Sequence, residues 1–313
     1  MMMTLSSAPV LTKPFMNGNN HMSTEIKNTF VDANGIRLHI AQAGPTDGTL
    51  VLLAHGFPEF WYGWRKQIPY LAKAGYHVIA PDQRGYNLSD KPQSVQDYHI
   101  DKLANDLIAL AKSQGKEKFH LVGHDWGAAV AWWTGVHYPE HLKSLSILNV
   151  PHLMVMRKNL LSNIKQIKKS WYAFAFQLPF FPEWFMSHQN FRKSIGALKH
   201  TSQPGSFSDD DLEQYREAWA QPGAMQSMIN WYRAIGRRPP KMANRGRVST
   251  PTQILWGAKD EFLGQEMVEP SIAFCDKGQV KIYPEATHWL QHDDADAVNT
   301  ALLTFMQEHD DLG

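Results

Sequence analysis

Short apolar runs alternate with amphipathic helical patterns along most of this chain. Eight runs predict β-strands, at residues 26–31, 37–42, 50–54, 77–80, 119–122, 145–149, 252–256 and 279–283. The run 50–54 is apolar at every position and several others are mostly apolar, as in strands that are buried on both faces. Apolar residues at 103, 107 and 110, and again at 298, 302 and 305, recur at helical spacing. This alternation predicts an α/β fold with a mostly parallel central sheet that is flanked by helices.

The alternation stops between about residues 151 and 245. This stretch contains helical segments but no convincing buried strand, and one helix is predicted to start at Ser208, with Asp211 placed as in a capping box. It closes on the charged, proline-containing run 237–240. We therefore expect a core built from residues 23–150 and 246–313, with a helical cap at 151–245 inserted after the sixth strand. Residues 1–22 make a poor signal peptide and are expected to be a disordered extension.

Composition and charge narrow the class of protein. The chain has 313 residues, 43% of them hydrophobic and 19% charged, and a formal net charge of +1. This balance provides no overall field that would favour nucleic acid or an anionic membrane. No apolar run approaches the length of a membrane span, and the single cysteine, Cys275, excludes an internal disulfide. We expect a cytoplasmic globular protein.

The segment 121–129, Leu-Val-Gly-His-Asp-Trp-Gly-Ala-Ala, is the most informative in the chain. It joins a predicted strand to a predicted helix through small residues that flank Asp125. This is the pattern of a nucleophile elbow, in which a sharp turn exposes one reactive side chain. Esterases and lipases carry serine at this position, whereas this chain carries aspartate. The alternative is that Asp125 only caps the helix.

A second motif follows the third predicted strand, where the sequence from residue 55 reads His-Gly-Phe-Pro. A glycine and a proline here can bend the chain so that the amide of Phe57 points into the crevice above the sheet. Together with the amide of Trp126, it would form a two-donor oxyanion hole. A plain Gly-Pro loop is the alternative.

Two further residues complete a triad in the chain order nucleophile, acid, histidine. Asp260 follows the seventh predicted strand, and His288 follows the eighth. The other position used for the acid in this arrangement, after the sixth strand, is occupied by Asn149-Val-Pro-His and offers no carboxylate. We therefore predict Asp260 as the acid.

These motifs together resemble the α/β-hydrolases of the epoxide hydrolase and haloalkane dehalogenase branch. Within that branch the chain is most similar to the soluble epoxide hydrolases, over about residues 25–308. The resemblance rests on His-Gly-Phe-Pro at 55–58, Asp-Gln-Arg-Gly-Tyr at 82–86, Gly-His-Asp-Trp-Gly at 123–127, Asn-Val-Pro-His at 149–152, and the motifs of Asp260 and His288.

The resemblance also implies roles for two tyrosines of the cap. The segments around Tyr172 and Tyr232 match those that supply the phenols which polarise an epoxide oxygen. Without the family, two core tyrosines with backbone partners would be the simpler interpretation. Eight aromatic residues fall within 171–185, and some of them should line an apolar pocket. We expect Phe57, Pro58, Trp126 and Phe176 to bind the substrate.

The implied reaction opens an aryl or alkyl epoxide to a vicinal diol with water and needs no cofactor or metal. Asp125 would form a covalent ester, which water activated by His288 would then hydrolyse. A haloalkane dehalogenase with the same triad remains an alternative, although the two tyrosines favour an epoxide. A non-catalytic ligand receptor on this fold is the second alternative. The sequence leaves open whether the chain forms a homodimer.

Overall fold

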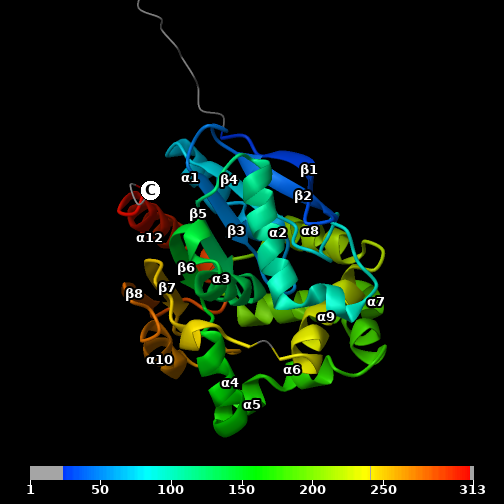
Figure 1. Ribbon diagram of the computed structural model, residues 1–313. Helices are drawn as coiled ribbons and strands as arrows, with labels where there is room; N and C mark the ends of the chain where they lie inside the picture. Colours follow the sequence, from blue (N-terminus) through cyan, green and yellow to red (C-terminus); the bar gives the residue numbers. More distant parts are fainter. Residues whose placement is uncertain (1–23, 240, 311–313) are drawn as a thin grey trace, which may run out of the picture.

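The computed structural model describes residues 24–239 and 241–310. The extension predicted at residues 1–22 lies outside the described residues. All eight predicted strands are present and form one sheet (Figure 1). Their bounds are β1 Lys27–Ala33, β2 Ile36–Ala43, β3 Leu50–Ala54, β4 His77–Pro81, β5 Phe119–His124, β6 Leu142–Leu148, β7 Thr252–Gly257 and β8 Gly278–Tyr283.

The strand order across the sheet is β1-β2-β4-β3-β5-β6-β7-β8, and β2 is antiparallel to both of its neighbours. The remaining neighbours are parallel, which confirms the predicted mostly parallel sheet. The predicted bounds of seven strands differ from the observed ones by one to three residues. The difference at the end of β6 matters most, because β6 ends at Leu148 and leaves Asn149 outside the strand with a φ of 53°. Asparagine adopts this left-handed conformation more readily than most residues do.

Parallel pairing brings the carboxyl ends of several strands to one edge of the sheet. Ala54 at the end of β3 pairs with Gly123 near the end of β5, and Leu148 pairs with Leu255 of β7. Gly257 at the end of β7 pairs with the last residue of β8. The loops that follow these strands therefore converge at the edge where such folds bind ligands.

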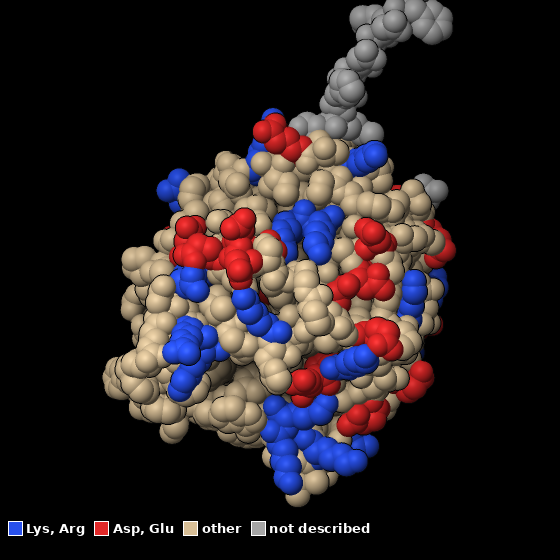
Figure 2. Space-filling view, turned by 180° about the vertical axis from the view of Figure 1, so that it is seen from behind, with Lys and Arg blue, Asp and Glu red and all other residues tan. Residues whose placement is uncertain are grey.

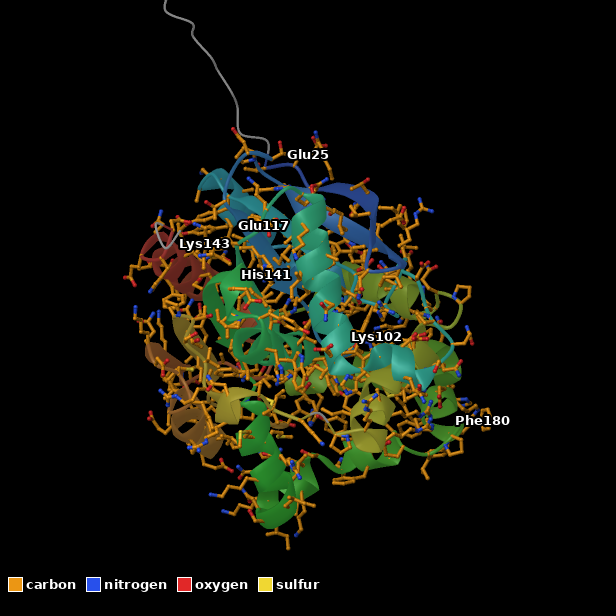
Figure 3. All side chains as sticks on the ribbon, in the orientation of Figure 1. Glu25, Lys102, Glu117, His141, Lys143 and Phe180 are labelled. Carbon is orange, nitrogen blue, oxygen red and sulfur yellow. The ribbon has the colours of Figure 1, made fainter. Side chains whose placement is uncertain are left out.

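Helices cover both faces of the sheet. The apolar side chains of α1 (Gln67–Lys73) and α12 (Ala295–Gln307) pack on one face, and those of α2 (Ile100–Ser113) and α3 (Trp126–His137) pack on the other (Figure 1). The apolar stripe that was predicted on α2 lies in one of these cores, and that on α12 is buried, with Val298 and Leu302 in the other core. On the outward side of α2, Lys102 is exposed (Figure 3). Two short helices, α10 (Val268–Ile272) and α11 (Leu290–Asp293), complete the core.

The chain between β6 and β7 carries six α-helices within the described residues, and we call this segment the cap. They are α4 Leu153–Ser162, α5 Ile164–Lys169, α6 Trp171–Ala175, α7 Phe181–Thr201, α8 Asp209–Trp219 and α9 Ala224–Arg237. Figure 1 shows α4, α5, α6 and α9 along the lower side of the molecule. The capping box predicted at Ser208 is present, with Asp211 as its partner. The helical insertion after the sixth strand is thus confirmed.

Candidate active site

Asp125 occupies the sharp turn between β5 and α3. Its φ of 48° and ψ of −122° are strained for a residue other than glycine, as at a nucleophile elbow. The turn also needs small neighbours, because a Cβ added at Gly127 would lie 2.0 Å from the carbonyl oxygen of Ala54. The strained backbone and the close approach to β3 argue against a simple helix cap at Asp125.

The loop after β3 approaches the Asp125 carboxylate directly. The amide of Phe57 donates a 2.6 Å hydrogen bond to Oδ1 of Asp125. A Cβ added at Gly56 would lie 2.3 Å from the Cβ of Asp125, so only glycine fits at this contact. Trp126 is the first residue of α3, where amides have no acceptor within the helix. The predicted donor Phe57 is therefore on this carboxylate, and the Trp126 amide as the second donor stays a prediction.

His288 lies between the two predicted carboxylates. Its Nδ1 is 2.7 Å from Oδ2 of Asp260, and its Nε2 is 3.6 Å from Oδ2 of Asp125. Asp260 also accepts hydrogen bonds from the amides of Phe262 and Leu263 and from the side chain of Asn149. The bond from Asn149, at the position after the sixth strand, orients the acid, which sequence reasoning did not anticipate.

The charges of this triad stabilise one another. Burial alone would lower the pKa of His288, but the negative charge of Asp260 and hydrogen bonding with Asp125 and Asp260 raise its pKa to about 10. Burial would raise the pKa of Asp125, but the hydrogen bond and charge of His288 lower it. Asp125 is therefore an ionised carboxylate at neutral pH, as a carboxylate nucleophile needs to be.

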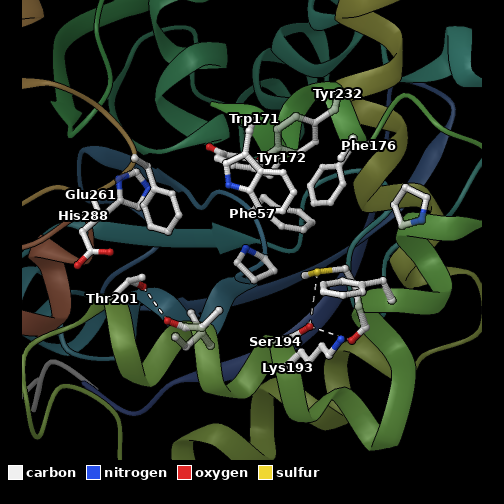
Figure 4. A pocket seen from close by; sticks show the side chains of 18 of the residues that line it. Phe57, Trp171, Tyr172, Phe176, Lys193, Ser194, Thr201, Tyr232, Glu261 and His288 are labelled. Atoms are coloured by element: carbon white, nitrogen blue, oxygen red, sulfur yellow. Dashed lines mark hydrogen bonds between the residues drawn. The ribbon is translucent and has the colours of Figure 1, made fainter. Parts of the chain in front are cut away.

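The two cap tyrosines face this carboxylate from helices that are distant in sequence. Tyr172 on α6 and Tyr232 on α9 have ring centroids 6.1 Å apart, and Phe176 packs against both rings (Figure 4). None of the hydrogen bonds between described residues uses the hydroxyl of Tyr172 or Tyr232. The interpretation as core tyrosines with backbone partners is therefore not supported within the described part of the chain.

Both phenols remain protonated around neutral pH. Burial is the main cause that raises the pKa of Tyr172 and of Tyr232, and the negative charge of Asp125 adds to it. A weak contact of the Trp126 indole opposes that rise at Tyr232. Protonated hydroxyls without protein acceptors are available to donate hydrogen bonds to a ligand.

A cavity of about 550 Å³ lies between the cap and the edge of the sheet. Seven predicted site residues line it: Phe57, Pro58, Asp125, Tyr172, Phe176, Tyr232 and His288. Trp126, which was also predicted to bind the substrate, is not among the lining residues. Its indole instead packs edge-on against Tyr232, with ring centroids 5.0 Å apart.

Sequence reasoning missed several residues of this lining. Phe262 and Trp289 directly follow the acid and histidine motifs, and that proximity could have revealed them. The side of the cavity formed by α7, which includes Ser194 and Leu198, carries no such signal (Figure 4). Its orientation depends on a kink at 188–191, where three consecutive residues have positive φ.

A buried carboxylate beside the triad was also missed. Glu59 accepts hydrogen bonds from Tyr215 at 2.7 Å and from Gln291 at 2.8 Å, and its oxygens lie 2.6 Å from His292 and 3.1 Å from His124. Burial would raise the pKa of Glu59, but these histidines hold it well below the usual range. Because Tyr215 belongs to α8, this bond ties the cap to the core.

The comparisons with known proteins agree with this geometry. A family model described as alpha/beta hydrolase fold matches residues 49–295. The chain is 42% identical to the AB hydrolase superfamily protein YfhM of Bacillus subtilis, over 90% of this chain and 98% of that protein. It is 39% identical to epoxide hydrolase 4 of Homo sapiens, over 88% of this chain and 77% of the human protein.

Among solved structures, the chain matches an epoxide hydrolase from Bacillus megaterium in complex with an inhibitor. The TM-score is 0.81 with 31% identity, and the match covers 89% of this chain and 100% of that one. The chain therefore belongs to the α/β-hydrolase superfamily and, within it, to the epoxide hydrolase family.

Proposed function

We propose that the protein hydrolyses apolar epoxides to vicinal diols through a covalent ester on Asp125. The observation that carries this proposal is the pairing of the Asp125 carboxylate with the phenols of Tyr172 and Tyr232 across one cavity. The phenols provide hydrogen-bond donors where an alkoxide would develop, and the carboxylate provides the nucleophile. Membership of the epoxide hydrolase family supports the same reaction.

In the first step, Oδ2 of Asp125 attacks one epoxide carbon while Tyr172 and Tyr232 donate hydrogen bonds to the epoxide oxygen. The bond between that carbon and the ring oxygen breaks, and one phenol transfers a proton to the departing alkoxide. Oδ1 of Asp125, which accepts from the amide of Phe57, becomes the carbonyl oxygen of the ester. The carbonyl is therefore already in the oxyanion hole when the ester forms.

In the second step, water attacks the carbonyl carbon of the ester. His288 accepts a proton from this water, and Asp260 stabilises the imidazolium that forms. The amides of Phe57 and Trp126 stabilise the charge on Oδ1 in the tetrahedral intermediate. Cleavage of the bond between this carbon and the diol oxygen then releases the diol, which takes its proton from the imidazolium of His288. The proton of the resulting Asp125 carboxyl group returns through water to the tyrosine phenolate, which restores the carboxylate and both phenols. No step requires a metal or an organic cofactor.

The aromatic lining supports an aryl or alkyl epoxide as the substrate. Phe57, Phe176 and Phe262 surround the space between the tyrosines and His288, with ring centroids 5.0 to 5.8 Å from their neighbours.

We also propose the domain division predicted above, with the core at 23–150 and 246–313 and the cap at 151–245. In this division the core supplies the nucleophile and the base, and the cap supplies the two phenols that donate to the epoxide oxygen.

Incubation with styrene oxide and with 1-bromobutane tests this proposal. The expected products are phenylethanediol from the first and no bromide from the second. Release of bromide without diol would favour the dehalogenase. Binding of either compound without turnover would favour a receptor.

A further inference from the structure

Large apolar side chains are exposed mainly in one part of the molecule, the first half of the cap. Among the described residues, twelve large hydrophobic side chains are exposed, and nine of them lie between residues 154 and 184. Exposed apolar groups scattered singly over a surface are ordinary, but a concentration of this kind marks a binding surface. The nine are Met154, Leu161, Ile164, Trp171, Phe174, Leu178, Phe180, Phe181 and Trp184.

The same segment is strongly cationic. Residues 151–182 contain five Lys or Arg residues and no Asp or Glu, whereas the whole chain has a net charge of +1. The rest of the chain is therefore net negative. Among the described residues, the ion pairs use none of these five cations, which are Arg157, Lys158, Lys165, Lys168 and Lys169.

The arrangement in space keeps these features together. Helices α4 and α5 lie at the lower end of the molecule in Figure 1. Figure 2 shows Lys and Arg gathered at that end, with uncharged surface on one side and acidic side chains on the other. Phe180, which is 85% exposed, projects outward at the right edge of the molecule in Figure 3, so the exposed side chains extend from the lower end along the cap. We call the nine exposed apolar residues and the five cations the cap patch.

The mouth of the active-site cavity borders the cap patch, and exposed Lys193 and Glu261 line it from other segments. Trp171, Phe181 and Lys168 all line the cavity, and all three are exposed. Trp171 is 64% and Phe181 is 52% exposed. A surface that covered the cap patch would therefore also cover the mouth.

We propose that the cap patch docks on the surface of an anionic phospholipid bilayer, so that apolar epoxides pass from the lipid into the cavity. Aromatic and aliphatic side chains bordered by cations are the composition that binds at such interfaces, where apolar groups enter the headgroup region and cations meet anionic lipid. A second copy of the chain fits this surface less well, because it would bring two sets of five cations together. Docking does not require a membrane span, and the described residues include no helix long and apolar enough for one.

Vesicle flotation of the full chain tests the docking. Vesicles of phosphatidylcholine alone are compared with vesicles that also contain about 30% phosphatidylglycerol, at low and at high salt. The expected result is flotation with the anionic vesicles, weaker binding at high salt, and little binding to phosphatidylcholine. Failure to float with anionic vesicles at low salt would overturn the proposal, and self-association in its place would assign the cap patch to a dimer.

Charge variants locate the binding surface. The triple variant Arg157→Gln, Lys158→Gln, Lys165→Gln removes three exposed cations that do not line the cavity. It should weaken binding to anionic vesicles roughly 100-fold. The matched control Lys73→Gln, Lys112→Gln, Lys277→Gln removes three exposed cations elsewhere. Equal losses in the two variants would mean that overall charge, and not the cap patch, drives binding.

Apolar variants separate insertion from simple charge attraction. Leu161→Ser, Ile164→Ser and Phe180→Ser together should reduce vesicle binding at least tenfold, whereas the control Phe30→Ser, Leu88→Ser should not. Unchanged binding in the cap variant would contradict insertion of these side chains. Docking itself does not depend on the proposed reaction, because flotation needs no turnover. Only the delivery of epoxides to the cavity depends on that reaction. Diol formation from a water-soluble epoxide measures the reaction separately and should be unchanged in these variants.

Discussion

The core and the cap present their reactive groups to the cavity in opposite ways. In the core, Asp260 accepts hydrogen bonds from one side chain and two backbone amides besides its contact with His288. In the cap, the hydroxyls of Tyr172 and Tyr232 take part in none of the hydrogen bonds between described residues. The core thus fixes the charged groups before substrate arrives, whereas the cap keeps two donors free for the substrate oxygen.

This difference has a physical reason. A carboxylate and an imidazole that are buried without partners would lose their charge, so the core must supply partners from the start. A buried neutral hydroxyl costs less to leave unpaired, and a cavity beside it can admit water or substrate. Pre-existing acceptors for the phenols would compete with the epoxide oxygen. The following predictions test this division between the two regions.

The largest effect is expected from the core. His288→Gln should lower steady-state turnover by about 10⁴-fold, because the ester forms but water is not activated. Intact-protein mass spectrometry after mixing with styrene oxide should show the enzyme heavier by one substrate. His141→Gln alters a residue at the amino end of β6, opposite the edge where the active site lies, and should retain normal turnover. If the adduct is absent while the variant still consumes epoxide, His288 is not the hydrolytic base.

A smaller loss is expected from each cap tyrosine. Tyr172→Phe and Tyr232→Phe should each slow ester formation by about 10- to 1,000-fold, the range for loss of one oxyanion donor. The fold should be kept, since only a hydroxyl is removed. Rapid-mixing measurements of ester formation separate this step from hydrolysis. Full rates in both single variants would remove the cap from the chemistry and reopen the dehalogenase alternative.

The pKa of His288 should be lower in the alkylated enzyme than in the free enzyme, and the pH dependence of ester hydrolysis measures it. His288 must be neutral to act as a base, and its pKa is about 10 when Asp125 is ionised. Ester formation removes the charge of Asp125, so the pKa of His288 should fall. Single-turnover hydrolysis should therefore speed up about tenfold per pH unit below an apparent pKa that is lower than 10. A rate that falls as pH rises over this range would contradict this role.

The smallest effect on catalysis is expected where the cap itself is tied to the core. Tyr215→Phe removes a hydrogen bond to the buried, ionised Glu59 and should lower the free energy of unfolding by about 1.5–3 kcal/mol. Ester formation should change only a few-fold. The control Tyr70→Phe alters an exposed tyrosine and should leave stability unchanged. Chemical denaturation of both variants measures the difference, and equal stability would show that this bond does not hold the cap.

The sequence predicted the core better than the cap. Asp125 and Asp260 follow the buried strands β5 and β7, and His288 follows the edge strand β8, so local motifs located them and parallel pairing brought them together. The network of Glu59 escaped prediction because His124, Tyr215 and Gln291 come from segments far apart in the chain. The position of the α7 side chains in the cavity depends on a kink that no sequence pattern predicted.

The net charge of the whole chain also concealed the local charge of the cap. A net charge of +1 indicated no affinity for anionic surfaces, yet the cations of residues 151–182 are not balanced locally. Net charge describes the field far from a protein, whereas docking responds to the charges within about a Debye length of the surface. Whether a cation forms an ion pair depends on which carboxylates the fold places near it.

The covalent role of Asp125 is the central claim, and oxygen-18 tests it most directly. With enzyme in excess over epoxide, a single turnover in labelled water should give mostly unlabelled diol, because the new diol oxygen comes from the Asp125 carboxylate. Solvent oxygen should enter the protein when the ester is hydrolysed, and digestion should place the label in the peptide that contains Asp125. Labelled diol in the first turnover, with no label in that peptide, would show that water attacks the epoxide directly and would contradict covalent catalysis by Asp125.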